Sequence, residues 1–420
     1  MKKYLLLITV IVLVSCSGSK KLSNQNLAYL VAPGLNFIYP DYKVYNLKGD
    51  SCRVFFSLDA SELLFMKADD SLGFMAEYGF TYELFRDYES KQLLDSGQIN
   101  FVLQQPTDSL SKATGYFDVH APDSSNYVLN ILLTDFNRRQ AVGGFITIDR
   151  TGQQSPDNFI AIDMRTGKPM VSSLTDREQR IRILPSENEN RKLYVRYFKN
   201  RYGLTSPPFG NDLTKPLSYS SDGFQLLDVA NREEYILDKP GIYHFQYDTM
   251  IKEGFTIFRF DEDFPKLTDA ASLIESIRFL TTREEFDKIS NSKNQKQAVD
   301  EFWLKMAGNR ERARVLIRNY YSRVQLANRF FTSYLEGWKS DRGLIYIIFG
   351  PPNTIYRTNE SETWNYSQNY SYGPLNFTFD KLFNPFTNND YKLRRSNYYE
   401  MPWYRAVDSW RDGRVVNENN

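Results

Sequence analysis

Short runs of β-branched and aromatic residues recur from about residue 46 to residue 263, and Asp, Ser, Gly and Pro separate them. Runs of this kind at regular spacing are typical of strands in a β-sandwich. Aromatic residues make up 15% of the 420-residue chain, which suits half-buried pleated surfaces. We therefore predict two N-terminal all-β domains of the β-sandwich, Ig-like kind, at residues 46–150 and 155–263. Examples of the runs are CRVFFSL, GQINFVL, NYVLNILLTDF, QRIRILP, KLYVRYF and FTIFRF.

The pattern changes after the acidic segment DEDFPK at residues 261–266, where apolar residues begin to recur at helical spacing. The spacing predicts helices over 269–289, 294–306 and 311–336, and the third carries one apolar stripe. Strand patterns follow in GLIYIIFG, TIYRT, ETWNYS, LNFTFD and DYKLRR. We therefore predict an α+β domain over residues 267–420. The stripe consists of Leu316, Tyr320, Val324, Ala327, Phe331 and Leu335.

The N-terminus, MKKYLLLITVIVLVSC, has a positive start and an apolar run that is too short to span a bilayer. Residues 13–16, LVSC, resemble a bacterial lipobox, so we predict a signal peptide at residues 1–15, lipidation of Cys16 and a tether at residues 16–45. An ordinary secretory signal with a chance Cys is the alternative. Ser17 follows the Cys instead of Asp, which by resemblance to lipoprotein sorting favours the outer membrane. We expect a lipid-anchored protein on its periplasmic face.

Composition excludes some partners and some chemistry. The formal charge is +1, so the chain has no basic field for nucleic acid. With Cys16 lipidated, Cys52 stands alone, and we expect it to be a buried, inert strand residue. The metal-binding, phosphate-binding and nucleophile motifs of common enzymes are absent from the sequence. We predict no cofactor, no metal site and structural roles for His120 and His244. The acidic run at residues 261–263 is expected to be a solvated linker and not a calcium site.

The stretch GWKSDRGLIYIIFGPP has two interpretations. In the first it is a structural elbow: Gly337 ends a helix, Ser340 and Asp341 form a turn, and a buried strand follows. In the second, Asp341 is an acid/base, Arg342 an anion clamp and Trp338 a stacking wall. We favour the elbow, because a lone Asp needs a second carboxylate, a His or a metal beside it. The candidate residues are Gly337, Trp338, Ser340, Asp341, Arg342, Gly343, Gly350, Pro351 and Pro352.

Two aromatic-rich segments are candidate recognition surfaces. The segment ETWNYSQNYSYG places Trp364, Tyr366, Tyr370 and Tyr372 among Asn and Ser, as in surfaces that contact sugars or proteins. The alternative, which we favour, is a β-hairpin whose aromatic residues alternate between core and surface. The segment at residues 397–410 docks either on its own domain or on a partner, since Trp, Tyr and Arg are common interface anchors.

The stretch GWKSDRGLIYIIFGPPNTIY resembles the signature of the GWxTD-domain family, which occurs in bacterial envelope proteins, many of them lipoproteins. Phe302-Trp303, YYSRVQLANRFF, LNFTFD and DYKL are similar to further parts of the family pattern, so the resemblance covers about residues 270–395. Ser340 stands where the family has Thr, and LKMAGN replaces an Arg-Asp-Pro-like turn. The resemblance implies an envelope protein and implies no reaction.

Together these features predict a non-enzymatic, lipid-anchored outer-membrane protein that faces the periplasm. We expect it to act as a scaffold or interaction component of an envelope assembly or secretion machine, with an outer-membrane or periplasmic protein as partner. One alternative is a lipoprotein that binds glycan or peptidoglycan through residues 364–372. Another is a hydrolase centred on Asp341.

Overall fold

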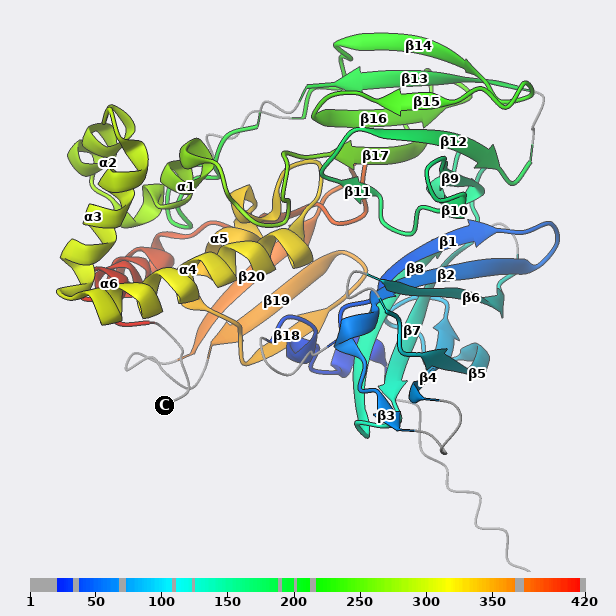
Figure 1. The fold of residues 1–420 in the computed structure, drawn as a ribbon, viewed down its shortest axis with the longest axis horizontal. Helices are drawn as coiled ribbons and strands as arrows, with labels where there is room; N and C mark the ends of the chain where they lie inside the picture. The colour runs from blue at the N-terminus through cyan, green and yellow to red at the C-terminus, as the bar shows by residue number, and fades with distance from the viewer. Residues whose placement is uncertain are drawn as a thin grey trace, which may run out of the picture.

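β-Sheets occupy the chain up to residue 259, and helices mixed with strands follow from residue 270, which confirms the predicted fold class. Figure 1 shows the β part at the right and top and the helical part at the left. The computed structural model describes residues 21–32, 38–67, 73–107, 111–122, 125–187, 191–199, 202–211, 217–366 and 374–415.

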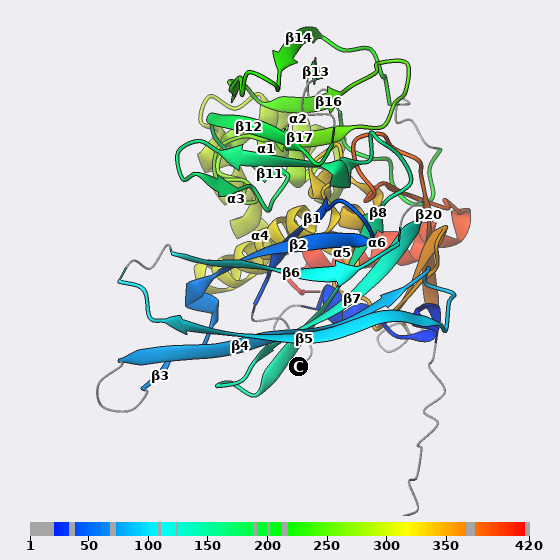
Figure 2. The ribbon, with the colours of Figure 1, turned by 90° about the vertical axis from the view of Figure 1, so that its right-hand side faces the viewer.

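The first β module consists of two antiparallel sheets that face each other (Figure 2). Side chains alternate between the faces of each strand, so each sheet has one apolar inner face. Phe56 of one sheet meets Phe80 and Phe101 of the other, with ring centroids 4.4 and 5.0 Å apart. One sheet contains β1 (Asp41–Asn46), β2 (Ser51–Asp59) and β6 (Lys112–His120). The other contains β3 (Met66–Lys67), β4 (Phe74–Phe85), β5 (Leu93–Gln104), β7 (Asn126–Asp135) and β8 (Gln140–Asp149).

The second β module is also built from two sheets. Phe159, Ile183, Val195 and Phe245 belong to one buried cluster between them. One sheet has the order β10 (Lys168–Pro169), β9 (Phe159–Asp163), β12 (Gln179–Pro185), β15 (Tyr235–Leu237). The other has the order β11 (Leu174–Thr175), β17 (Phe255–Arg259), β16 (Gly241–Gln246), β13 (Lys192–Phe198), β14 (Gly223–Asp228).

A short 3-10 turn, η4 (Pro156–Asn158), joins the two β modules. Lys43 of β1 forms an ion pair of 3.3 Å with Asp157, and Asn46 donates a hydrogen bond of 2.8 Å to Asn158. The Lys43 and Asp157 side chains are almost fully buried. The polar contacts fix the first module against the start of the second.

The C-terminal domain packs helices against a four-stranded antiparallel sheet with the order β18-β19-β20-β21. The stripe predicted for the long helix is confirmed from Leu316 to Phe331, whose five residues are all buried, but Leu335 lies beyond the helix end. The strands are β18 (Thr354–Arg357), β19 (Ser361–Tyr366), β20 (Leu375–Lys381) and β21 (Tyr391–Leu393). The helices are α1 (Ala270–Ser276), α2 (Arg283–Ser290), α3 (Gln295–Ala307), α4 (Arg310–Phe331), α5 (Asp341–Phe349) and α6 (Glu400–Arg411).

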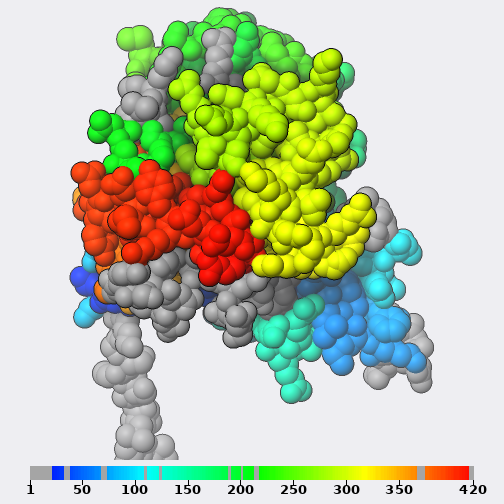
Figure 3. Space-filling model, turned by 90° about the vertical axis from the view of Figure 1, so that its left-hand side faces the viewer, coloured from blue at the N-terminus to red at the C-terminus, as the bar shows by residue number. Residues whose placement is uncertain are grey.

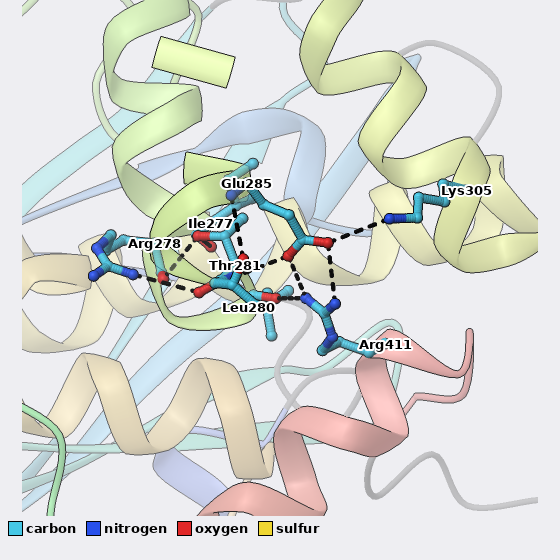
Figure 4. Close-up of polar contacts among 8 residues, drawn as sticks. Ile277, Arg278, Leu280, Thr281, Glu285, Lys305 and Arg411 are labelled. Atoms are coloured by element: carbon cyan, nitrogen blue, oxygen red, sulfur yellow. Dashed lines mark hydrogen bonds and ion pairs between the residues drawn. The ribbon is translucent and has the colours of Figure 1, made fainter. Parts of the chain in front are cut away.

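The helical run predicted over 269–289 is two helices in the structure, α1 and α2. Thr282 and Glu285 form a capping box that starts α2, which explains why the helical pattern is interrupted here. Glu285 then accepts hydrogen bonds of 2.8 and 3.1 Å from Arg411 of α6 and forms an ion pair of 3.4 Å with Lys305 of α3 (Figure 4). Helices α2–α4 and α6 share one face of the molecule (Figure 3).

The segment GLIYIIF is a helix, α5, and not the predicted strand. Every residue of α5 is buried, so the all-round apolar pattern reflects burial on all sides. Strand propensity is a weak preference that such packing overrides. The Ser340 side chain caps the N-terminus, because its Oγ accepts a hydrogen bond of 3.0 Å from the Gly343 amide.

Part of the predicted tether is packed against the C-terminal domain. Leu27, Ala28 and Val31 are buried in the same cluster as α4 and α5. The Leu27 amide donates to Ile355 O at 2.8 Å, and the Tyr346 hydroxyl donates to Val31 O at the same distance. Residues 21–32 are therefore no free linker, because their apolar side chains complete the core. Over the described residues, no helix combines the length and the apolar character needed to cross a membrane.

Candidate functional site

The GWKSDR stretch lies where α4 turns into α5, and two glycines allow the turn to close. A Cβ on Gly337 would lie 2.0 Å from the Ala327 carbonyl oxygen of α4. A Cβ on Gly343 would lie 1.9 Å from the Gly337 carbonyl oxygen. Both contacts are with backbone, which cannot move aside as a flexible side chain does. Only glycine therefore fits at either position.

Two polar side chains near the end of α4 hold the returning chain. Asn328 accepts a hydrogen bond of 3.1 Å from the Trp338 amide and donates one of 2.8 Å to Pro265 O. Thr332 Oγ1 accepts a hydrogen bond of 3.0 Å from the Gly337 amide. Trp338 itself is buried in the main core, as the elbow interpretation predicts for a side chain folded back on the helix. Gly337 does not end α4, which stops at Phe331.

Asp341 lies at the start of α5, and its two carboxylate oxygens are both engaged. Oδ1 forms a 2.6 Å ion pair with Arg395 Nη2 and accepts a hydrogen bond from the Thr205 hydroxyl. Oδ2 accepts hydrogen bonds from the Leu393 amide at 2.8 Å and from Arg395 Nη1 at 3.2 Å. The Asp341 and Arg395 side chains are about nine-tenths buried. Asp341 thus connects α5 to β21 and to the segment 202–211 that leaves the second β module.

Arg342 belongs to a second polar cluster, which also contains Glu362, Arg357 and Asn389. Its Nη2 donates to the Asn389 carbonyl oxygen at 2.9 Å, and its guanidinium lies 4.1 Å from the Tyr391 ring centroid. Nη1 forms an ion pair of 3.7 Å with Glu362, which also pairs with Arg357 at 2.7 Å. Burial alone would raise the pKa of Glu362, but Arg357 and Arg342 outweigh it and lower that pKa. Glu362 is therefore held as a carboxylate between two arginines.

The last carbonyl groups of α5 find specific partners, as the end of a buried helix requires. The Gly350 amide donates to Tyr346 O at 2.8 Å, and Arg323 Nη1 donates to Ile347 O at 3.2 Å. Trp410 Nε1 of α6 donates to Ile348 O at 3.0 Å. Gly350 adopts a φ of +82°, which turns the chain into Pro351 and Pro352 toward β18.

The two aromatic candidates of β19 are core residues. Trp364 and Tyr366 are both fully buried, so the interpretation of them as partner or glycan contacts, which the sequence left open beside the favoured hairpin, is wrong. They point to the same face of β19, and the Tyr366 hydroxyl donates to Gly350 O at 2.8 Å. The structure therefore supports the alternating hairpin for these two residues. Tyr370 and Tyr372 lie outside the described residues, as does Cys16.

The segment at residues 397–410 docks on its own domain through α6, where Trp403 and Trp410 are buried. Its outer face carries Tyr398, Met401 and Tyr404, all exposed. Met401 and Tyr404 are three residues apart on α6 and therefore lie on one side of the helix, and Tyr398 lies in the 3-10 turn η7 (Asn397–Tyr399) just before it.

The two histidines and Cys52 lie apart from this elbow. His244 is fully buried, and its ring nitrogens lie 2.8 Å from Thr256 Oγ1 and 2.9 Å from Lys252 O. Burial lowers the pKa of His244 to about 4. Cys52 is also fully buried, and burial raises the pKa of its thiol to about 12, as expected for an inert residue. The part of the chain that the structure describes contains no group of three or more His, Cys, Asp or Glu placed to bind a metal.

A crevice of about 320 Å³ lies over the elbow, lined by Thr205, Asp341, Arg342, Phe383 and Tyr391, among others. The polar groups of Asp341 and Arg342 are committed to Arg395, Thr205, Leu393, Asn389 and Glu362. The partners could not be identified from the sequence, because they lie from 20 residues (Glu362 from Arg342) to 136 residues (Thr205 from Asp341) away, and only the fold brings them together. The RR pair of DYKLRR is the nearest signal that the sequence offers for Arg395.

Comparison with known proteins agrees with this geometry. A search of curated proteins finds no match to the chain. The family model of the GWxTD domain matches residues 241–412, from β16 to the end of α6. The match extends at both ends beyond the residues that carry the resemblance in the sequence, and it takes in β16 and β17 of the second β module. The chain therefore contains a GWxTD domain, and the elbow between α4 and α5 lies within the matched residues.

Proposed function

We propose that this protein is a non-enzymatic, lipid-anchored component of the outer membrane that faces the periplasm and acts as a scaffold in an envelope assembly or secretion machine. Its anchor is the acylated Cys16. Its body is the two β modules and the GWxTD domain, held together as one unit. Its partner is an outer-membrane or periplasmic protein.

The observation that carries the proposal is that the Asp341 and Arg342 side chains face inward and bind other residues of the protein. Asp341 is bound by Arg395, Thr205 and the Leu393 amide, and Arg342 by Glu362 and Asn389. Such contacts are those of a structural clamp that holds three segments together. They do not favour a catalytic centre, since a general acid or base needs an oxygen within reach of the reacting group. A rigid body of this kind suits a protein that holds others in place.

A surface for the partner is available on α6. Tyr398 in the turn before α6, and Met401 and Tyr404 on α6, are exposed in one row at intervals of three residues, and Arg405 follows Tyr404 in the sequence. Aromatic residues and Arg are the usual anchors of protein interfaces. We assign the partner contact to this row, because its apolar side chains are not needed for the core that Trp403 and Trp410 form.

The test is an affinity purification of the full-length tagged protein from its native envelope after mild crosslinking, with mass spectrometry as readout. We expect one membrane or periplasmic protein at constant stoichiometry, lost with Tyr398→Ser/Tyr404→Ser and retained with the control Tyr356→Ser, an exposed tyrosine on β18. A Cys16→Ser variant should be released from the membrane fraction. Recovery of the protein alone from every preparation would contradict the scaffold proposal.

The structure does not favour the two alternatives, glycan binding through residues 364–372 and a hydrolase centred on Asp341. Glycan binding through residues 364–372 loses Trp364 and Tyr366 to the core. The hydrolase hypothesis requires that Asp341→Asn abolish function without changing stability, whereas its ion pair favours a large loss of stability.

A further inference from the structure

Three cationic side chains, Arg357 of β18, Lys381 of β20 and Arg342 of α5, meet at one end of the C-terminal sheet. Arg342 and Arg357 share the carboxylate of Glu362, at 3.7 and 2.7 Å. Lys381 at the end of β20 is close enough to both arginines for their charges to act on it. Lys381 pairs with Tyr391 in the register of β20 and β21, and the Tyr391 ring covers Arg342. Arg357, Lys381 and Tyr391 line one crevice.

The charges at this end of the sheet do not balance, because three positive groups surround one paired carboxylate, that of Glu362. The Lys381 ammonium has no hydrogen bond or ion pair among the described residues, although it is half-buried. Burial lowers the pKa of Lys381, and the positive charges of Arg357 and Arg342 lower it further. Asp390, the other acid near Arg342, has a pKa that burial raises, and it accepts a hydrogen bond of 2.9 Å from Asn384. Three positive groups around the single paired carboxylate of Glu362 cost stability, and such arrangements are concentrated at binding sites.

The crevice has the size and the lining of a small-molecule site. Its volume is about 520 Å³, within the range of about 300–1,000 Å³ that is usual for ligand pockets. It lies where both β modules meet the GWxTD domain, so three parts of the chain build its walls. Aromatic rings and side-chain amides suit the faces and hydroxyl groups of a sugar. The rings are those of Tyr42, Tyr88, Phe145 and Tyr391, and the amides those of Asn384, Asn388 and Asn389.

The carboxylates on the β-module walls of the crevice do not neutralise the positive charges of Arg357 and Lys381. Asp157 is paired with Lys43, and Asp149 accepts hydrogen bonds from the amide and hydroxyl of Thr151 at 2.9 and 2.7 Å. Glu253 is exposed. All three belong to the β modules, whereas Arg357 and Lys381 belong to the C-terminal sheet.

We propose that this crevice binds an anionic sugar, with its phosphate or carboxylate group held by Lys381 and Arg357 and its ring between Tyr88 and Tyr391. The ligand adds a negative charge to that of Glu362, and charge-assisted contacts of this kind are among the strongest available in a protein. The inference goes beyond the scaffold role and does not depend on it.

The test is calorimetric titration of the full protein with three probes of similar size: glucose 1-phosphate, glucuronate and glucose. We expect binding of one or both anions and none of neutral glucose, and the better anion identifies phosphate or carboxylate as the group bound. Lys381→Gln should weaken that binding by about 10- to 100-fold. Lys381→Arg should retain most of it, and Lys168→Gln, which removes the charge of an exposed lysine of the second module, should bind as wild type does.

A second readout separates binding from folding. Because Lys381 is repelled by two arginines, Lys381→Gln and Lys381→Met should melt at or above the wild-type temperature without ligand. A structural lysine would show the opposite. Equal affinity for glucose and for the anions, or binding that is unchanged in Lys381→Gln, would overturn the proposal, as would the absence of binding to all three probes.

Discussion

The Asp341 carboxylate and the Arg395 guanidinium form a buried ion pair, with 2.6 Å between Oδ1 and Nη2. Removing one partner of such a pair leaves a charge in a site where both side chains are about nine-tenths buried. This cost commonly exceeds what the pair itself contributes to stability. The contribution of Asp341 to the free energy of unfolding can therefore be measured by mutating either partner of this pair.

Asp341→Asn should therefore destabilise the protein by about 3 kcal/mol, because Arg395 stays buried without a counter-charge. A lost turn or cap, which is all that the sequence suggests for Asp341, would cost about 1 kcal/mol. The measurement is denaturant unfolding followed by tryptophan fluorescence. Asp341→Asn/Arg395→Met should cost less than the sum of the single changes, and strict additivity would show that the two residues do not act as a pair.

The close approach of α4, the turn and α5 predicts a strong effect of adding a single methyl group. Gly337→Ala and Gly343→Ala each place a Cβ about 2 Å from a backbone carbonyl oxygen. Each should cost about 3 kcal/mol or more, since the backbone must separate to make room. Gly152→Ala is the matched control, because nothing lies within 4 Å of that Cβ, and it should change stability by less than about 0.5 kcal/mol. Wild-type melting of Gly337→Ala would contradict this packing.

The departure of the signature from its family pattern at residue 340 is expected to be harmless. The Ser340 hydroxyl accepts from the Gly343 amide at 3.0 Å and donates to the Gly337 carbonyl oxygen at 2.7 Å. Ser340→Thr keeps both hydrogen bonds and should change the free energy of unfolding by less than about 0.5 kcal/mol, whereas Ser340→Ala should cost about 1 kcal/mol. Thermal melting of the two variants side by side measures the difference. An equal loss in both would show that the hydroxyl is not the cap.

The sequence predicts much of this fold because its strands and helices carry clear periodic patterns. The stripe from Leu316 to Phe331 is buried as its spacing requires, and the runs at β19 and β20 are strands. GLIYIIF was misassigned, because a short run buried on all sides has the same composition as a buried strand. Only the cap at Ser340 distinguishes the helix, and a serine before an acidic residue is equally typical of a turn.

The candidate site was predicted in outline but not in its partners. The signature marks Asp341 and Arg342, yet Thr205, Glu362 and Arg395 follow no spacing rule that would select them. Their positions depend on how the second module and β21 pack against α5. Trp364 illustrates the reverse problem, since amphipathic aromatics among Asn and Ser occur both on recognition surfaces and in hairpins with one buried face.

Stability should depend on pH through His244. Burial lowers its pKa from 6.5 to about 4, so the unfolded chain binds a proton between these values that the folded protein does not. Above about pH 6.5, His244 is neutral in both states and does not affect the free energy of unfolding. As the pH falls to about 4, protonation of His244 in the unfolded chain lowers the free energy of unfolding by about 3 kcal/mol. The buried carboxyl of Asp157 acts in the opposite direction, because burial raises its pKa.

Denaturant unfolding between pH 4 and 8 of wild type and His244→Gln isolates this contribution. The difference in free energy between the two proteins should shrink as the pH falls. His120→Gln, a change at an exposed histidine, should leave the wild-type profile unchanged. Parallel profiles for wild type and His244→Gln would contradict the prediction.

The contact that holds α2 to α3 and α6 should fail at a lower pH than the one at His244. Hydrogen bonds from Arg411, with help from the Thr282 amide and Lys305, lower the pKa of Glu285 from 4.5 to about 2 (Figure 4). A depressed carboxyl pKa adds stability that is complete above about pH 4.5 and is lost as the pH falls toward 2. Glu285→Gln should remove this dependence and loosen α2, because Arg411 and Lys305 lose their shared partner.

Amide hydrogen exchange of α2 and α6 measures the loosening. Glu284→Gln, one position earlier on the exposed side of the same helix, should leave exchange unchanged, and equal exchange in both variants would show that Glu285 does not hold the three helices together.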